Sequence, residues 1–324
     1  MLQTQQRPKK AKLKRSSSKL DLGPLQMLLG QWKSTGGTGW NMIAVPFADG
    51  PSKYRLLLNQ YDETLTFSVA GEDVVNRAIE KNDSGQSTET DQSLAAVGYV
   101  QDIVQVDATD LPRSELAGSK DLKIHHEPGM WLWIREPRTD AFDIARMATI
   151  PHGDAVLAMG TSATVEGPPD IPELEGLPVG ITDELDSSAY LAPYREFKEQ
   201  PFNGKFDPTR PSEPLRHANQ DVDIVRTTVL PVSTDSGSGG LVNTPLIVRQ
   251  ANATQMTATL WIQELATCDA RGRPRLRLQY AQVVMLDFFP RNDGKPGRIR
   301  WPHVSVNTLC KVSDDEQASM PRVY

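Results

Sequence analysis

Short runs of alternating apolar and polar residues constrain this chain most, because this period fits strands and not helices. In residues 64–70, Leu65, Phe67 and Val69 alternate with polar neighbours, as in a half-buried strand. The chain also has 24 prolines and 23 glycines, which favour frequent turns over long helices. The sequence therefore predicts an all-β or β-rich fold.

We expect nine or ten short strands in meander order. The main candidates are residues 30–41, 53–61, 64–70, 96–106, 121–134, 143–160, 257–265, 275–289 and 301–311. The second and third of these are predicted to form a hairpin joined at Asp62 and Glu63. A meander of this size fits an antiparallel up-and-down β-barrel of about ten strands, whose interior holds one small ligand.

Two segments lack this alternation. Residues 80–93 are polar and are predicted to be a loop. Residues 163–245 are rich in proline, acidic residues, serine and glycine, and we expect a long loop and helix insertion there, with local helix near 187–198. We therefore expect a single barrel domain over residues 21–324 that carries this insertion.

Charge is distributed unevenly along the chain. The net charge is −6, yet the first 19 residues contain seven basic and no acidic residues. Residues 1–20 are predicted to be a disordered basic arm. The remainder is acidic, which argues against a nucleic-acid partner.

Cysteine content and hydropathy indicate the compartment. The two cysteines, Cys268 and Cys310, form no CxxC zinc motif and are too few for a disulfide framework. The sequence is compatible with one disulfide between them. No apolar run reaches the roughly 18 residues that a membrane span requires, and no signal peptide follows the basic start. We therefore expect a cytoplasmic, reduced protein without a membrane span.

The last strand candidate, WPHVSVNTLCK at residues 301–311, carries a histidine near its start. Strand alternation places His303, Ser305 and Asn307 on one face. A late strand thus presents a single imidazole. Its position alone leaves open whether it packs, donates a hydrogen bond or binds a metal.

Three segments together resemble the nitrobindin-like heme-binding β-barrels, which share the calycin-type shape of the fatty-acid-binding proteins. They are GQWKSTGGTGWN at 30–41, HHEPGMW at 125–131 and WPHVSVNTL at 301–309. Further segments are similar to a longer, peroxidase-like branch: RMATIPHGD at 146–154, TATLWIQE at 257–264 and LQYAQVVMLDF at 278–288. The resemblance covers about 22–160 and 245–312, and the segment between them has no counterpart in small nitrobindins.

The resemblance implies a heme b inside the barrel, with His303 as the ligand of the heme iron. It implies further cofactor contacts from Trp32, Gly37 and Gly39 in the first strand. His126 and Arg146 would lie near the heme propionates or the open heme face. Chemistry on peroxynitrite, nitric oxide or peroxide would follow, as in a heme-dependent isomerase or peroxidase.

The residues themselves nominate His126, Arg146 and His152 as catalytic candidates. His125 and His126 are adjacent, so at most one points into a cavity, and Glu127 shares the side of His125. An inward histidine acts as a general base or polarises a ligand.

Arg146 alternates with apolar residues, which makes it a candidate inward charge. A buried arginine requires a carboxylate or an anionic ligand as its partner. An internal salt bridge with Glu127 or Glu264 is the structural alternative to ligand binding.

Three functions therefore remain open. The first is heme binding, and the second is a heme-free barrel that holds a fatty-acid-type ligand through Arg146. The third is a cofactor-free enzyme acting on a small organic substrate. A homodimer is compatible with each of them.

Overall fold

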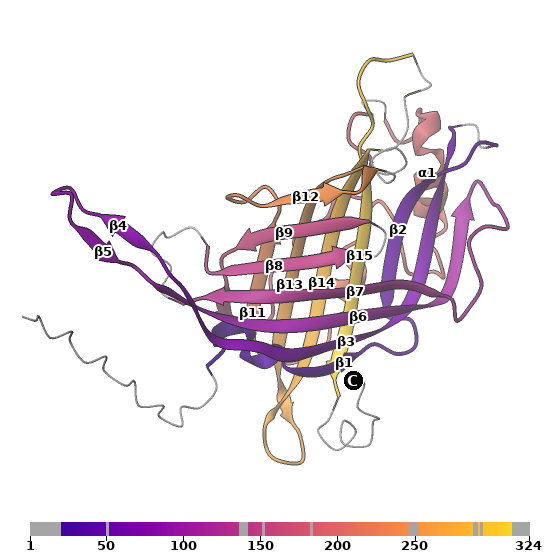
Figure 1. The fold of residues 1–324 in the computed structure, drawn as a ribbon. Coiled ribbons are helices and arrows are strands. Elements are labelled where there is room, and N and C mark those ends of the chain that lie inside the picture. Colours follow the sequence, from indigo (N-terminus) through magenta and orange to yellow (C-terminus); the bar gives the residue numbers. More distant parts are fainter. Residues whose placement is uncertain are drawn as a thin grey trace, which may run out of the picture.

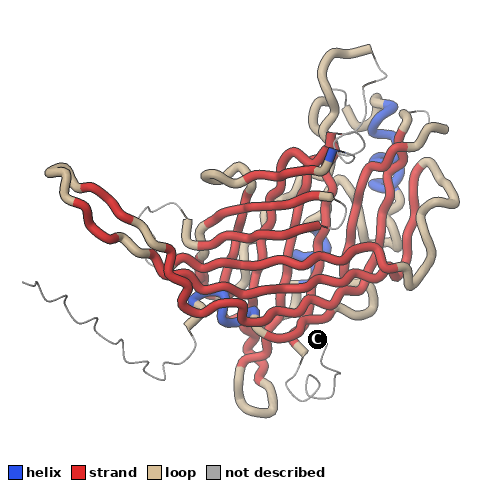
Figure 2. Tube along the Cα trace, viewed as in Figure 1, coloured by secondary structure: helices blue, strands red, loops and turns tan. Residues whose placement is uncertain are grey.

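The computed structural model describes residues 21–49, 52–135, 142–150, 153–181, 184–245, 252–287, 291 and 294–312. Strands dominate these ranges (Figures 1 and 2). The strands are β1 Gly30–Lys33, β2 Gly39–Pro46, β3 Tyr54–Asn76, β4 Ile79–Lys81, β5 Ser87–Glu89, β6 Gln92–Leu111, β7 Lys123–Ile134, β8 Ile144–Ile150, β9 Asp154–Gly160, β10 Ala163–Glu166, β11 Ile224–Ser233, β12 Gly240–Asn243, β13 Asn252–Cys268, β14 Pro274–Asp287 and β15 Trp301–Lys311. The helical elements are η1 Gly23–Leu28, η2 Ala189–Leu191, α1 Ala192–Glu199 and α2 Glu213–Ala218.

One antiparallel sheet curves into a ring. Its strands follow the order β11-β13-β14-β15-β1-β3-β6-β7-β8-β9, and Ser233 of β11 pairs with Met159 of β9 to close it. β2 pairs with β15 and β3, so it continues the position of β1. The ring has ten positions within the described ranges, which confirms the predicted barrel of about ten strands.

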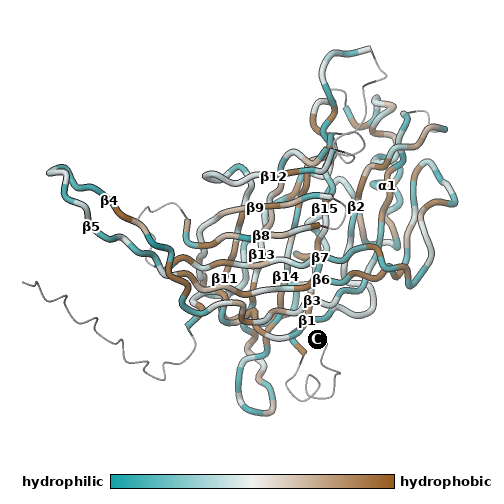
Figure 3. Tube along the Cα trace, in the orientation of Figure 1, coloured by the Kyte–Doolittle hydropathy of each residue, from teal (hydrophilic) through white to brown (hydrophobic). Residues whose placement is uncertain are grey.

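The barrel is flattened into two walls. In Figure 1, β6, β7, β8 and β9 cross in front of β13, β14 and β15 at a steep angle. This crossing is typical of orthogonal sheet packing, in which the inner faces of both walls supply one core. The turns between β4 and β5 and between β13 and β14 are hydrophilic where they project from the walls (Figure 3).

The 3₁₀ helix η1 closes one end of the barrel. Its apolar residues Leu25 and Leu28 are fully buried among inward-facing side chains. The carbonyl oxygen of Leu28 accepts a 2.7 Å hydrogen bond from the indole nitrogen of Trp32. η1 therefore covers the barrel interior at this end.

The insertion covers the outer face of the barrel with a second apolar core. The ring of Trp40 stacks on Phe206, with centroids 5.5 Å apart. Tyr54 and Trp301 lie 4.3 Å apart, centroid to centroid, under η2 and α1. A cavity of about 120 Å³ remains beside Tyr54, but the hydroxyls of Tyr54 and Ser52 in its wall donate to backbone carbonyls of the insertion. The outer face of the barrel therefore serves mainly to pack against the insertion.

Several expectations are corrected by this arrangement. The hairpin at Asp62 and Glu63 is wrong, because β3 runs through both residues with a bulge after Gln60. Residues 80–93 are not only a loop, since β4 and β5 form a small hairpin there. The insertion is shorter than 163–245, because β11 within it is a barrel strand.

The expectation of a local helix within the insertion is confirmed. The predicted helix near 187–198 corresponds to α1 at Ala192–Glu199. β15, which carries His303, pairs with both β1 and β2 of the glycine-rich segment. Cys268 and Cys310 are both free and exposed. No helix in the described part of the chain is long and apolar enough to cross a membrane. The predicted basic arm, residues 1–20, lies outside the described residues.

Candidate functional site

Strand alternation brings two polar networks into an otherwise apolar barrel interior. On β7, the register places Glu127 and Trp131 on the inner face. On β8, Arg146 is the register partner of Trp131 and is buried. The long strand β3 contributes Glu63 to the same interior, in phase with Leu65.

The first network is centred on a buried ion pair. Nη2 of Arg146 lies 2.7 Å from Oε1 of Glu127, which also accepts a short hydrogen bond from the Tyr99 hydroxyl. Nε of Arg146 donates to the Tyr99 hydroxyl at 2.9 Å, and Nη1 donates to Oε1 of Gln282 at 2.7 Å. His125 approaches Oε2 of Glu127 at 3.3 Å. Arg146 therefore has Glu127 as its partner, which was one of the two alternatives from sequence.

The environment keeps this pair ionised. Burial acts to raise the pKa of Glu127, but the Arg146 charge and hydrogen bonds from His125 and Tyr99 lower that pKa to about 2. Burial acts to lower the pKa of Arg146, and Tyr99 and Glu127 raise it above its ordinary value. Both side chains therefore remain charged, and the pair as a whole has no net charge.

The second network is centred on Glu63, which is 2% exposed. Its Oε2 accepts hydrogen bonds of 2.8 Å from Nδ2 of Asn307 and 2.8 Å from the Tyr280 hydroxyl. Its Oε1 accepts one of 2.7 Å from Nε2 of Gln101. The Tyr61 hydroxyl lies 2.8 Å from that of Tyr280. Burial raises the pKa of Glu63, because these neutral donors only partly offset the desolvation.

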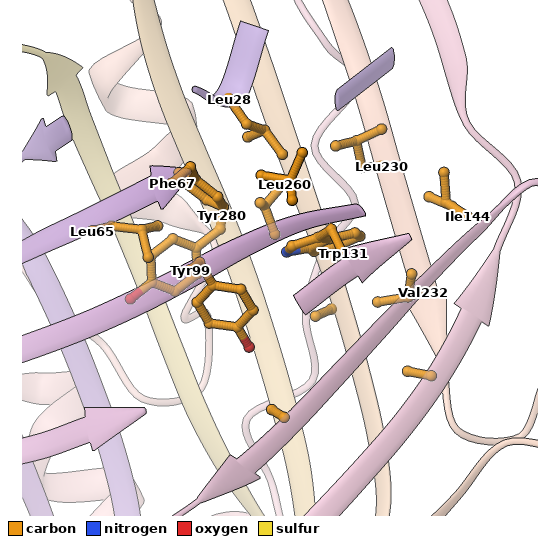
Figure 4. Close-up of a cluster of buried hydrophobic side chains, with 14 of the residues drawn as sticks. Leu28, Leu65, Phe67, Tyr99, Trp131, Ile144, Leu230, Val232, Leu260 and Tyr280 are labelled. Atoms are coloured by element: carbon orange, nitrogen blue, oxygen red, sulfur yellow. The ribbon is translucent and has the colours of Figure 1, made fainter. Parts of the chain in front are cut away.

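A small cavity of about 20 Å³ separates the two networks. Tyr99 and Tyr280 lie beside it among Leu65, Phe67 and Leu260 (Figure 4). Its remaining wall consists of Gln101, Trp131, Arg146, Ala258 and Gln282. A cavity of this size holds about one water molecule.

His303 faces the interior further along the barrel. Its register partner is Val284, a member of the inner core, and Nε2 of the imidazole lies 2.7 Å from Nδ2 of Asn41. Nδ2 of Asn41 also donates to Oγ of Ser305 at 2.8 Å, and Ser305 is the register partner of Gln282. His303 and Arg146 therefore lie along one row of polar side chains, in which Ser305 and Gln282 are neighbours on adjacent strands.

The other candidates from the sequence lie elsewhere. His126 is on the outer face of β7, where Nδ1 lies 2.8 Å from Oδ1 of Asp102 and both side chains are about half exposed. The inward histidine of the pair is His125, which corrects the placement of His126 near the ligand. His152 lies outside the described residues.

The three candidates at the start of the barrel, Trp32, Gly37 and Gly39, pack against other side chains or form a turn. Trp32 is fully buried at the η1 end and carries the ammonium group of Lys311 over its ring. A Cβ on Gly39 would lie 2.2 Å from the ring of Tyr61, so glycine lets that ring cross the strand. Gly37 has a φ of 71° and exchanges backbone hydrogen bonds with the side chains of Asp62 and Gln60. Each of these positions has a structural explanation within the barrel.

Heme b does not fit this interior as it is packed. Ligand pockets for molecules of drug size are about 300–1,000 Å³, whereas the cavity beside Arg146 is about 20 Å³. The Nε2 atom of His303 that would bind iron accepts a hydrogen bond from Asn41 if it is the unprotonated nitrogen. No group of three or more His, Cys, Asp or Glu residues in the described ranges is placed to hold a metal ion.

Fold and site together define a class: a closed antiparallel barrel with a polar centre inside an apolar interior. No protein-family model and no curated protein matches the sequence. The assignment of a function therefore depends on the geometry of the interior.

Proposed function

We propose that this protein binds a small, mainly apolar molecule inside its barrel, with one uncharged polar head between Arg146 and Tyr280. The observation that carries this proposal is the cavity at which the two polar networks meet. Leu65, Phe67 and Leu260 supply its apolar wall. Apolar walls with a few converging polar groups are typical of small-molecule sites, and because this cavity is smaller than such sites, the ligand must displace side chains to enter.

The charge balance favours a neutral head. The guanidinium of Arg146 is already matched by the fully buried carboxylate of Glu127. A carboxylate head would add a second negative charge with no new cation beside it, which is costly in a buried site. A fatty-acid-type ligand is therefore expected to bind less well than a ketone, ester or amide of the same size.

The arginine still has donors for such a head. A guanidinium carries five N–H groups, and the bonds to Tyr99, Gln282 and Glu127 use three of them. Within the described residues, two N–H groups therefore remain for an acceptor oxygen of the ligand.

Access is expected from the end opposite η1. The inward side chains of Ile43, Gln282, His303 and Ser305 are partly exposed there, whereas those near η1 are fully buried. A ligand larger than the present cavity would displace Gln282 first, because this side chain is only half-buried. The tail would then lie against Ile43 and Val284.

Native mass spectrometry of the freshly purified protein, followed by titration with matched ligands, tests the proposal. We expect a straight-chain ketone to bind at least about tenfold more tightly than the carboxylic acid of equal length. Ala258→Leu fills the cavity and is expected to abolish binding, while Ala155→Leu makes the same change at an exposed strand position. Tighter binding of the acid, or full binding by Ala258→Leu, would refute this site.

Heme titration tests the second candidate, in which the inward-facing His303 would hold the heme iron and the interior would have to repack around the cofactor. A Soret band that is lost in His303→Ala would support a heme protein. Asn41→Ala is expected to strengthen such a band, because it removes the group in contact with Nε2. A protein that stays colourless while binding the ketone would support the first proposal.

A further inference from the structure

Glu63 is a buried carboxyl group whose contacts differ from those of Glu127. Its side-chain partners are Asn307, Gln101 and Tyr280, and each is uncharged. The network that includes Arg146 does not use it. A buried carboxyl with only neutral partners is poised to hold a proton, and Glu63 is separated from the cavity only by Gln101 and Tyr280, which line it.

A proton on Glu63 has one natural acceptor. Asn307 and Gln101 approach the carboxyl with amide nitrogens, which donate and do not accept. The Tyr280 hydroxyl both donates and accepts, and it lies 2.8 Å from Oε2. When Glu63 is neutral, Tyr280 accepts this proton and must turn its own O–H elsewhere.

Two directions are open to the Tyr280 hydroxyl hydrogen. One leads to the Tyr61 hydroxyl at 2.8 Å, which in turn lies 3.2 Å from the carbonyl oxygen of Val306. The other leads into the cavity that Tyr280 lines. A ligand with an acceptor oxygen therefore competes with Tyr61 for one hydrogen bond.

We propose that Glu63 acts through Tyr280 to set which kind of ligand head the cavity accepts. With Glu63 protonated, Tyr280 donates to an acceptor head such as a ketone oxygen. With Glu63 ionised, Tyr280 donates to Glu63 and offers the ligand only a lone pair. Binding of a ketone is then coupled to proton uptake by Glu63, an inference that rests on the proposed function.

Other titratable groups surround this pair. β3 contributes Tyr61, β6 contributes Tyr99, β7 contributes His125 and Glu127, and β8 contributes Arg146. A positive charge on His125 acts to lower the pKa of Glu63, so a variant without this imidazole is needed as a control.

We call the change of Tyr280 from donor to acceptor on protonation of Glu63 the proton switch. Infrared spectroscopy over a range of pH, without ligand, tests this proton switch. We expect a C=O band of a buried protonated carboxyl that is absent in Glu63→Gln and shifted in Tyr280→Phe. The band should persist in His125→Gln and in Tyr61→Phe. A wild-type spectrum without this band, or a band unaffected by Tyr280→Phe, would overturn the inference.

Calorimetry in buffers of different ionisation enthalpy tests the coupling to binding. Near and just above the pKa of Glu63, ketone binding by the wild type should take up a fraction of a proton, and at higher pH it should be about fivefold to tenfold weaker, the value of one hydrogen bond. The alcohol of the same skeleton both donates and accepts, so its affinity should change less than about twofold. Tyr280→Phe should remove the pH dependence, whereas Tyr61→Phe should keep it.

Failure of the role of Glu63 and failure of the proposed ligand site give different results. A ketone that binds without proton uptake would overturn the role of Glu63 and leave the proposed function intact. Absence of any binding, together with a Glu63 band that responds to Tyr280→Phe, would refute the proposed ligand site and leave the proton switch in place.

Discussion

Two buried carboxyl groups in the same interior have opposite environments. Glu127 contacts the guanidinium of Arg146, whereas Glu63 contacts only neutral donors. The pKa of Glu127 is therefore lowered and that of Glu63 raised. Groups whose pKa values are pushed apart in this way are common at functional sites.

The ion pair is expected to make the barrel sensitive to the removal of one partner. Arg146→Met leaves the carboxylate of Glu127 buried without a cation, and we expect a loss of about 3–5 kcal/mol in the free energy of unfolding. Arg146→Met combined with Glu127→Gln should cost clearly less, because no net charge is left inside. Urea unfolding of both variants measures the difference, and equal losses would show that the pair has no special role.

The same pair predicts the response to acid. Because the pKa of Glu127 is lowered to about 2 from an ordinary 4.5, its contribution is complete above pH 4.5 and is lost as the pH falls towards 2. The double variant should lose less stability than the wild type over this range. Unfolding curves at several pH values test the sign, and a steeper acid loss in the double variant would contradict it.

The sequence alone predicted only some of the side chains that face the barrel interior. The apolar alternation around Arg146 identified it as inward, and the opposite facing of His125 and His126 followed from adjacency alone. Glu63 was missed because it was read as a turn, although extending the alternation of Leu65 and Phe67 backwards puts it on the same face. Asn41 and Gln282 gave no signal, because their roles depend on contacts between strands distant in sequence.

At the scale of elements, the insertion is attached to the barrel through a buried arginine. Arg277 on β14 donates from Nη1 to the carbonyl oxygen of Ala218 at 2.7 Å and from Nη2 to Oδ1 of Asn219 at 2.5 Å. Its Nε donates to Oε1 of Gln263 at 2.6 Å. Burial lowers the pKa of Arg277. Ala218 ends α2, so the cation also lies at the negative end of that helix.

Removal of this arginine is expected to loosen the insertion without opening the barrel. Arg277→Met leaves three acceptors without their donor, at a cost of about 1–3 kcal/mol. Limited proteolysis should then cut faster near α2, while the barrel strands stay protected. Arg275→Met, two residues away and exposed, is the matched control. Equal cleavage rates in both variants would contradict this attachment.

The insertion shows where element prediction from sequence fails. Its proline-rich and acidic composition was visible, and α1 lay where expected. β11 was missed because it is embedded in that composition and contains Pro231, a residue that usually argues against an interior strand. The barrel accepts Pro231 where β11 passes from its pairing with β10 to its single pair with β9.

At the scale of the whole molecule, the ring closes where β9 meets β11, and a glycine permits the approach. A Cβ on Gly160 would lie 1.7 Å from the carbonyl oxygen of Pro231, a backbone atom that cannot move aside. β9 is also paired with β8, where Ala158 is the register partner of Arg146. Closure of the ring therefore helps to hold the guanidinium in place.

Gly160→Ala is expected to break this closure and to cost about 3 kcal/mol or more, the upper range for overpacking. Gly240→Ala is the matched control on the neighbouring strand β12, because a Cβ there meets no atom within 4 Å. Its effect should stay within about 0.5 kcal/mol. Urea unfolding compares the two, and ketone titration should show weaker binding only for Gly160→Ala, since β9 supports β8 and Arg146. Equal stability of the two variants would mean that the ring does not depend on this approach.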